Sequence, residues 1–164
     1  MRFPPDFAKL LLVQFEAVYT KPMSEVEAEV ISEEQKQRAF DSLHSLPFAR
    51  MMGMQLVDLQ VDEAVIRMEM RDELRQPSGV LHGGVTATLI DTAMAFAVIT
   101  RLAEHEKAST IDLTVHYLRP HISGTFTCTA RIVRAGKRIF TVSADVVNDK
   151  EKLIATAVST YTKV

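Results

Sequence analysis

The sequence predicts an α+β fold in which a curved antiparallel sheet wraps around one central helix. Six segments after residue 53 alternate apolar and polar residues, which is the period of half-buried strands. Between the second and third of these, the segment from about Gly84 to Leu102 is apolar on every side. A helix of that kind must be surrounded. A sheet curved around it is the economical way to bury it, so we expect this architecture.

The strands and turns can be placed from the alternation and from the turn residues between them. Asp62-Glu63 separates the first two strands, and a loop with Pro77-Ser78-Gly79 leads into the helix. Arg134-Ala-Gly-Lys137 is a hairpin turn between the fourth and fifth strands. The expected strands are Met54–Leu59, Val65–Arg71, Ile111–Tyr117, Phe126–Ile132, Ile139–Val147 and Leu153–Thr162.

The chain is long enough for one domain with a substantial core. We interpret residues 1–47 as an N-terminal helical extension and residues 48–164 as the main domain. In the extension, a first helix from Phe7 ends before Pro22, and the capping box Ser32-Glu-Glu-Gln35 starts a second one. The extension carries no evident chemistry, and we expect it to pack on the main domain or on a partner subunit.

Composition argues against several classes of protein. The net charge of −2, with acids and bases interspersed, gives no nucleic-acid footprint. The single cysteine, Cys128, excludes an intrachain disulfide and fits a reducing compartment. The apolar run is too short to span a bilayer, and the histidines lack the spacing of metal ligands. We therefore expect a cytoplasmic protein without a metal site, nucleic-acid partner or membrane insertion.

The segment Leu81-His-Gly-Gly carries the strongest functional signal because it precedes an apolar helix with one acid, Asp91. Gly83 and Gly84 would leave free N–H groups at a helix start, where negative charge is stabilised. A carboxylate in such a segment is costly to bury unless something pairs with it or uses it. These features suggest acyl chemistry. Two other interpretations stay open: Asp91 as a structural acid hydrogen-bonded to loop N–H groups, and His82 as a helix cap or core histidine.

Helix geometry then predicts where a complete site lies. Gly83 and Asp91 are eight residues apart, which is about 12 Å along a helix. A donor, a carbonyl group, an attacking water and its base span less, because each contact is about 3 Å. We therefore expect the helix start of one subunit to meet Asp91 of another, in a homodimer with two equivalent sites.

These residues carry a resemblance. Leu81-His-Gly-Gly followed by the acid, Thr110–Pro120 and Arg134-Ala-Gly-Lys137 are together similar to acyl-CoA thioesterases of the hot-dog fold, in the PaaI-like branch. The medium- and long-chain acyl-CoA thioesterases of bacteria are the nearest match. The resemblance extends over residues 47–164, and it implies hydrolysis of acyl-CoA to free acid and coenzyme A.

The resemblance also implies a role for each site residue. Asp91 would activate water or attack the thioester itself, and the Gly83 N–H would polarise the carbonyl group, with His82 close by. The amide side chain of Gln76 would assist, and the Thr110 hydroxyl would hold the water or the acid. Gly84 is assigned to substrate binding.

Coenzyme A is implied as part of the substrate, with no separate cofactor. Arg134, Lys137 and Arg138 cluster at the hairpin turn and could meet its phosphates, or they could be ordinary solvated charges. The resemblance favours a tetramer built as a dimer of dimers. Acyl chain length is open, because the apolar residues that could line an acyl tunnel could equally pack in the core; they are Met51, Met52, Met54, Met94 and Phe96.

Two alternative functions remain at this stage. One is a hot-dog hydratase or dehydratase, which needs a catalytic histidine facing an acid, as His82 and Asp91 could superficially supply. The other is a non-catalytic acyl-CoA-binding protein. A glycine pair at a helix start favours oxyanion binding over the first alternative.

Overall fold

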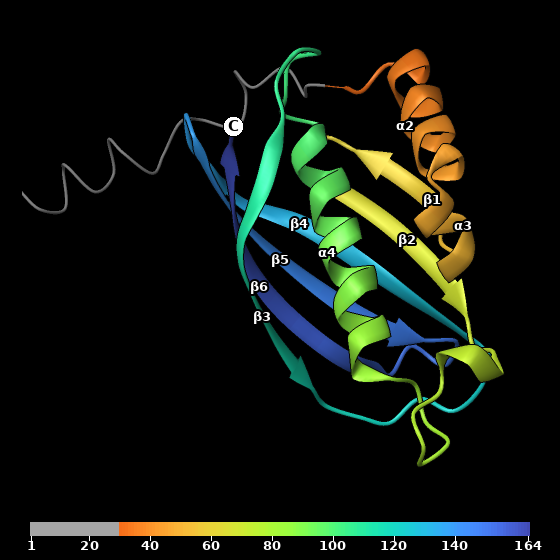
Figure 1. The fold of residues 1–164 in the computed structure, drawn as a ribbon. Helices are drawn as coiled ribbons and strands as arrows, with labels where there is room; N and C mark the ends of the chain where they lie inside the picture. Colours follow the sequence, from red (N-terminus) through yellow and green to blue (C-terminus); the bar gives the residue numbers. More distant parts are fainter. Residues whose placement is uncertain (1–29) are drawn as a thin grey trace, which may run out of the picture. The chain divides into compact units, whose positions relative to one another are not determined.

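The computed structural model describes residues 30–164, and residues 31–164 form one compact unit (Figure 1). Along the chain, this unit contains two helices, two strands, one short 3₁₀ turn, a long helix and four strands. The helix expected from Phe7 onward lies outside the described residues.

Helix α2 (Glu33–Ser45) begins at the predicted capping box. The Ser32 hydroxyl accepts the Gln35 N–H at 3.2 Å, and the Gln35 side chain accepts the Ser32 N–H at 2.9 Å. The helix buries Ala39 and Leu43 in the same core as the sheet, and the short α3 (Pro47–Met52) follows at once. The predicted division of the chain at residue 47 stays a prediction.

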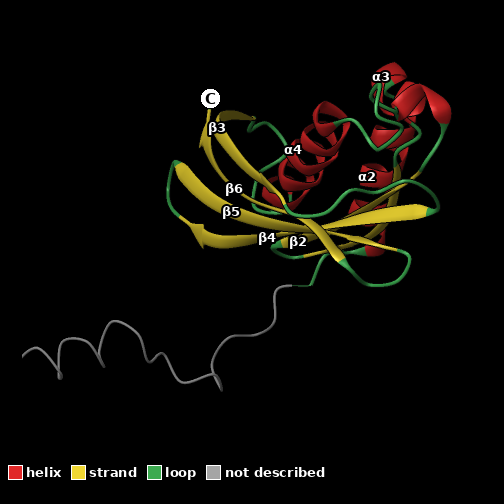
Figure 2. Ribbon diagram, turned by 90° about the horizontal axis from the view of Figure 1, so that it is seen from below, coloured by secondary structure: helices red, strands yellow, loops and turns green. Residues whose placement is uncertain are grey.

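The sheet has six strands in the order β1-β2-β4-β5-β6-β3, and every neighbouring pair is antiparallel. It forms one curved layer with the helices on one side (Figure 2). The predicted hairpin turn joins β4 to β5, where the Gly136 N–H donates to the Ile139 carbonyl. The strands are β1 (Gln55–Gln60), β2 (Glu63–Glu69), β3 (Ala108–Tyr117), β4 (Thr125–Ala135), β5 (Ile139–Asn148) and β6 (Leu153–Lys163).

Helix α4 (Gly83–Ile99) lies against the concave face of this sheet, which confirms the predicted α+β hot-dog architecture (Figure 1). Its apolar residues are buried on more than one side, since Leu89 and Val98, both at 0% exposure, are nine residues apart and point in opposite directions. The helix ends three residues earlier than predicted. After Ile99 the backbone continues in tighter turns, in which the Arg101 and Leu102 N–H groups donate three residues back.

Strand β3 is an edge of the sheet, since β6 is its one neighbour. Leu113 and Val115 pack against the core as the alternation predicts. Ile111 and Tyr117 were placed on the same face, yet each is 56% exposed. A break in register between Thr110 and Asp112 shifts the pairing at the first of these positions. A long edge strand with exposed apolar side chains offers unpaired backbone groups to which another strand can bind.

Candidate active site

The start of α4 leaves one backbone donor free. The His82 carbonyl accepts the N–H groups of Val85 and Thr86, and the His82 ring accepts the Gly84 N–H through Nδ1 at 2.9 Å. The Gly83 N–H has no acceptor among residues 30–164. A free N–H at the positive end of a helix is a donor for a carbonyl oxygen that gains negative charge.

His82 is therefore the N-cap of α4. The sequence left a helix cap and a core histidine open for this residue. Because Nδ1 accepts a hydrogen bond, the neutral ring carries its proton on Nε2. The ring is exposed, so this Nε2–H is available to a ligand near the helix start. The Gly84 N–H, in contrast, is already used by the ring.

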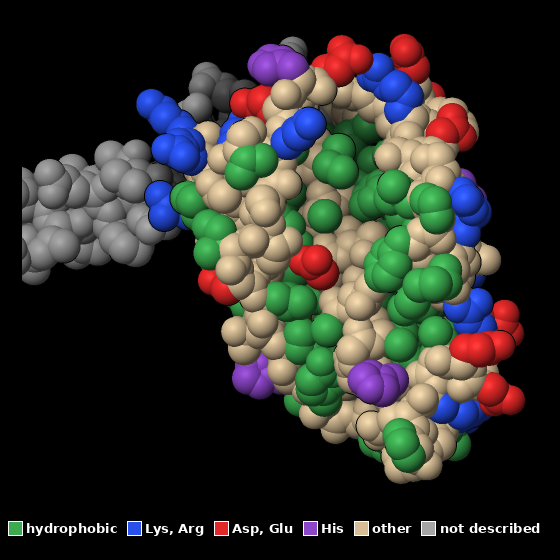
Figure 3. Space-filling view, viewed as in Figure 1, with side chains coloured by type: hydrophobic (Ala, Val, Ile, Leu, Met, Phe, Trp, Pro, Cys, Tyr) green, Lys and Arg blue, Asp and Glu red, His purple; other side chains and the backbone are tan. Residues whose placement is uncertain are grey.

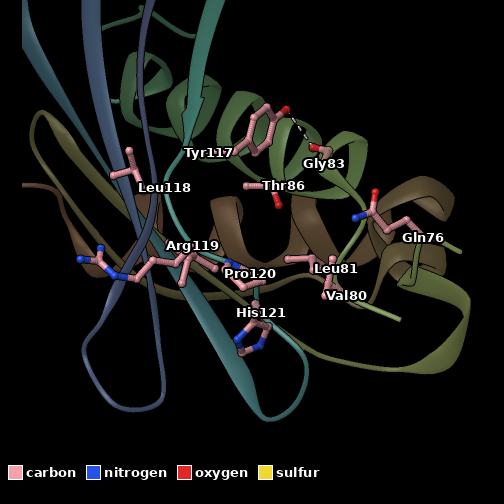
Figure 4. Close-up of a pocket in the computed structure, with 11 residues that line it drawn as sticks. Gln76, Val80, Leu81, Gly83, Thr86, Tyr117, Leu118, Arg119, Pro120 and His121 are labelled. Atoms are coloured by element: carbon pink, nitrogen blue, oxygen red, sulfur yellow. Dashed lines mark hydrogen bonds between the residues drawn. The ribbon is translucent and has the colours of Figure 1, made fainter. Parts of the chain in front are cut away.

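Both glycines lie close against a neighbouring ring, so a side chain at either position would require that ring to shift slightly. A Cβ atom on Gly83 would lie 3.3 Å from the Tyr117 ring, and one on Gly84 would lie 3.1 Å from the His82 ring. The Tyr117 hydroxyl donates to the Gly83 carbonyl at 3.1 Å (Figure 4). Tyr117 thus closes one side of the helix start, a contact that the sequence motifs did not indicate.

A pocket of about 420 Å³ opens at Gly83. Gln76 lines it beside the helix start, as the resemblance implies (Figure 4). The Gln76 amide nitrogen donates to the Ser78 hydroxyl at 3.0 Å, which leaves the amide oxygen without a donor among the described residues. Tyr117 and Arg119 line the pocket from the end of β3, and the Arg119 guanidinium donates to the Leu153 carbonyl.

Asp91 lies in the middle of α4 and is held by two hydroxyl groups. The Thr110 hydroxyl donates to Oδ1 at 2.9 Å, which agrees with the contact expected for this residue. The Tyr161 hydroxyl lies 2.7 Å from the same Oδ1 and 2.9 Å from the Asp91 carbonyl oxygen. The interpretation of Asp91 as an acid bonded to loop N–H groups finds no support in these contacts.

Sequence reasoning missed Tyr161. The signal was present, because Tyr161 falls on the buried face of its strand, and a buried tyrosine hydroxyl normally needs a hydrogen-bond partner. Which partner it finds depends on tertiary structure, since Tyr161 and Asp91 are 70 residues apart in sequence.

The two halves of the predicted site open into different pockets within one chain. Gly83 and Gln76 line the first, and Asp91 lines a second, of about 260 Å³, with Ala87 and Thr110. No lining residue is shared between them. Because Gly83 and Asp91 both lie in α4, the expected spacing of about 12 Å along the helix applies.

The basic cluster lies apart from the pocket at Gly83. Arg134, Lys137 and Arg138 are exposed at or beside the turn between β4 and β5. The Arg138 carbonyl accepts the Lys163 N–H, which ties this turn to the end of β6. The same end of β6 carries Tyr161, whose hydroxyl contacts Asp91. The basic cluster is therefore hydrogen-bonded to the strand that contacts the acid. Figure 3 shows hydrophobic side chains over the middle of one face, with one acidic side chain among them and most other charged side chains around the rim.

Within residues 30–164, no helix has the length and apolar character needed to cross a membrane. The described part of the chain likewise contains no group of three or more His, Cys, Asp or Glu side chains arranged to hold a metal ion.

Comparison with known proteins gives one consistent result. The family described as Thioesterase superfamily matches residues 78–155, which include the helix start and the acid. The medium/long-chain acyl-CoA thioesterase YigI of Escherichia coli K12 is 30% identical over 134 residues, with coverage of 73% of this chain and 86% of that protein. The acyl-coenzyme A thioesterase PaaI of the same organism is 31% identical over 109 residues, covering 65% and 75%.

A solved structure supports the same grouping. The E. coli PaaI protein from the phenylacetic acid degradation operon aligns with a TM-score of 0.73 at 25% identity. The alignment covers 79% of this chain and 92% of that one. The PaaI structure therefore shares this fold, and the match to the family includes the segment that holds Gly83 and Asp91.

Proposed function

Because this chain belongs to the thioesterase superfamily, we propose that it hydrolyses medium- to long-chain fatty acyl-CoA to the free acid and coenzyme A. Thioester hydrolase activity follows from the family and from relatives that are named acyl-CoA thioesterases. The acyl chain length is our extension, and it rests on the name of the YigI relative. Within the site, the observation that carries the proposal is the free Gly83 N–H at the start of α4.

The geometry supports a direct sequence of steps. The Gly83 N–H donates to the thioester carbonyl oxygen and stabilises the negative charge that develops there. Asp91 accepts the proton of a water that attacks the carbonyl carbon, or attacks that carbon itself to form a mixed anhydride that water then cleaves. The carbon–sulfur bond breaks and coenzyme A leaves. Water and the substrate suffice, so the proposal includes no cofactor.

We propose that the site is completed between two subunits. In one chain the Gly83 donor and the Asp91 carboxylate open into separate pockets, so they do not reach one carbonyl group. The unpaired edge of β3, which holds Thr110 and exposes Ile111, offers a surface along which a second copy can pair. A dimer of dimers, as the resemblance implies, and a cytoplasmic location complete the proposal, with the single cysteine as support for the location.

Arg134, Lys137 and Arg138 are proposed to bind the phosphates of coenzyme A. Exposed cations on a turn are free to reach a flexible anionic group, and arginine matches phosphate geometry well. The hydrogen bond between Arg138 and Lys163 joins them to the end of β6, the strand whose Tyr161 contacts Asp91. In a shared site they would therefore serve a substrate whose carbonyl group lies at the partner's helix start.

A thiol-release assay over acetyl-, octanoyl-, palmitoyl- and phenylacetyl-CoA tests this proposal. We expect the highest kcat/KM with the octanoyl and palmitoyl substrates, and loss of turnover in Asp91→Asn with substrate binding retained. Unchanged thiol release in that variant would exclude Asp91 as the catalytic acid. Hydration of crotonyl-CoA without thiol release would favour the hydratase alternative. Binding of every acyl-CoA without cleavage would favour a binding protein.

A further inference from the structure

Two hydroxyl groups from different strands meet on a single oxygen of Asp91. Tyr161 on β6 and Thr110 on β3 both donate to Oδ1, at 2.7 and 2.9 Å. None of residues 30–164 donates to Oδ2. The carboxylate is therefore asymmetric: one oxygen is anchored, and the other has no donor from the described part of the chain.

Strand pairing explains why both donors point at the same atom. Thr110 and Tyr161 are direct partners in the β3–β6 ladder, and Phe140 is the partner of Tyr161 in β5. Cross-strand neighbours on one face lie close enough to share a target on the helix that packs against that face. Tyr161 is 2% exposed, so its ring is fixed by packing and its hydroxyl has little freedom to turn away.

Tyr161 acts as a neutral donor in this arrangement. Burial, together with the hydrogen bond to Asp91, raises the pKa of the phenol well above its ordinary value of 10.0. Ionisation of Tyr161 therefore does not occur at ordinary working pH, and the O–H stays available to the carboxylate. Of the two side chains that contact the Asp91 carboxylate within the described residues, Tyr161 is titratable and Thr110 is not.

We propose that Tyr161 is a positioning residue for hydrolysis: with Thr110 it holds Oδ1 of Asp91, so that Oδ2 is the oxygen that reacts. This inference rests on the proposed function and adds the identity of the reacting atom. In the general-base path, the water proton passes to Oδ2 while the water oxygen bonds to the carbonyl carbon. In the nucleophilic path, Oδ2 forms that bond itself, and in both paths the carbon–sulfur bond breaks.

The substitution Tyr161→Phe tests the proposal because it removes the hydroxyl and keeps the ring. We expect kcat to fall about tenfold, with KM for acyl-CoA little changed, since a hydrogen bond to a charged group is lost.

Thr100→Val is the matched control, since Thr100 also lies partly buried and uses its hydroxyl twice, with the Asp62 N–H and the Ala97 carbonyl. It removes hydrogen bonds at the far end of α4, so it should lower the melting temperature without lowering kcat. If Tyr161→Phe behaves in the same way, its role is structural and the proposal is overturned.

The carboxyl-carbon NMR signal of Asp91, compared between wild type and Tyr161→Phe, separates this proposal from the proposed function. A changed chemical shift in the variant supports the positioning role whether or not the protein cleaves any thioester. An unchanged chemical shift rejects the positioning role. Failure of the wild-type protein to release thiol from any acyl-CoA rejects the proposed function alone.

Discussion

Replacement of Gly83 by proline should remove the proposed oxyanion donor, and Gly83→Ala controls for the added side chain. Gly83 is the first residue of α4, a position where proline is favoured because the N–H it lacks has no helical acceptor. His82, the residue before it, has φ −68° and ψ 131°, which is the extended conformation that a following proline requires. The backbone is therefore already arranged for Gly83→Pro.

The expected loss of kcat depends on how many free N–H donors the start of α4 has. The Gly84, Val85 and Thr86 N–H groups are already used by His82, so none of them replaces the lost donor without breaking the cap. Loss of one oxyanion donor typically costs about 10²–10³ in kcat. We expect that loss in Gly83→Pro measured against Gly83→Ala. The alanine variant keeps the N–H but introduces the same Cβ, 3.3 Å from the Tyr117 ring.

Thiol release and melting temperature should be measured for both variants. Similar melting temperatures with a large difference in kcat would assign the loss to the N–H. Equal activity in the proline and alanine variants would refute the reasoning, since the donor would then be dispensable.

The same variant tests whether subunits share the site. Co-expression of Gly83→Pro chains with Asp91→Asn chains, carrying different affinity tags, yields a purified mixed dimer. If sites are shared, one of its two sites pairs an intact Gly83 with an intact Asp91, so activity returns to about half of wild type. If each chain holds a whole site, both sites of the mixed dimer are damaged and no activity returns.

Two further predictions concern the lone thiol and the basic turn. Cys128 is fully buried, and burial raises the pKa of its thiol. A thiol reagent should therefore label the protein only after unfolding. Labelling of the folded protein would contradict the described core. The triple variant Arg134→Gln, Lys137→Gln, Arg138→Gln should raise KM for acyl-CoA about tenfold, through lost phosphate contacts, and leave hydrolysis of a short N-acetylcysteamine thioester unchanged. An equal change for both substrates would argue against phosphate binding.

Local patterns predicted the elements well because each strand carries its own alternation and the central helix is one long apolar segment. The helix, for example, was expected from about Gly84 and begins at Gly83. Its far end was less predictable. Residues up to Leu102 are compatible with a helix, but the Thr100 hydroxyl binds the Asp62 N–H and the Arg101 side chain pairs with Asp62, so contacts with the β1–β2 turn are made where the helix ends.

The site was predictable as far as it lies in one segment. His82, Gly83 and Asp91 follow one another in the chain, and Gln76 precedes them by a short loop, so a motif could indicate them. Tyr161 and Tyr117 could not be found in this way. They reach the site through strand pairing and sheet curvature, over separations of 70 and 34 residues.

Helix α4 also limits which sequence changes the protein tolerates. Each residue of an α-helix advances the direction of the side chains by about 100°. One residue inserted between Gly83 and Asp91 would therefore turn the carboxylate away from Thr110 and Tyr161 while the helix start stayed in place. The length of this segment is therefore constrained, because the number of residues between Gly83 and Asp91 sets the direction of the acid.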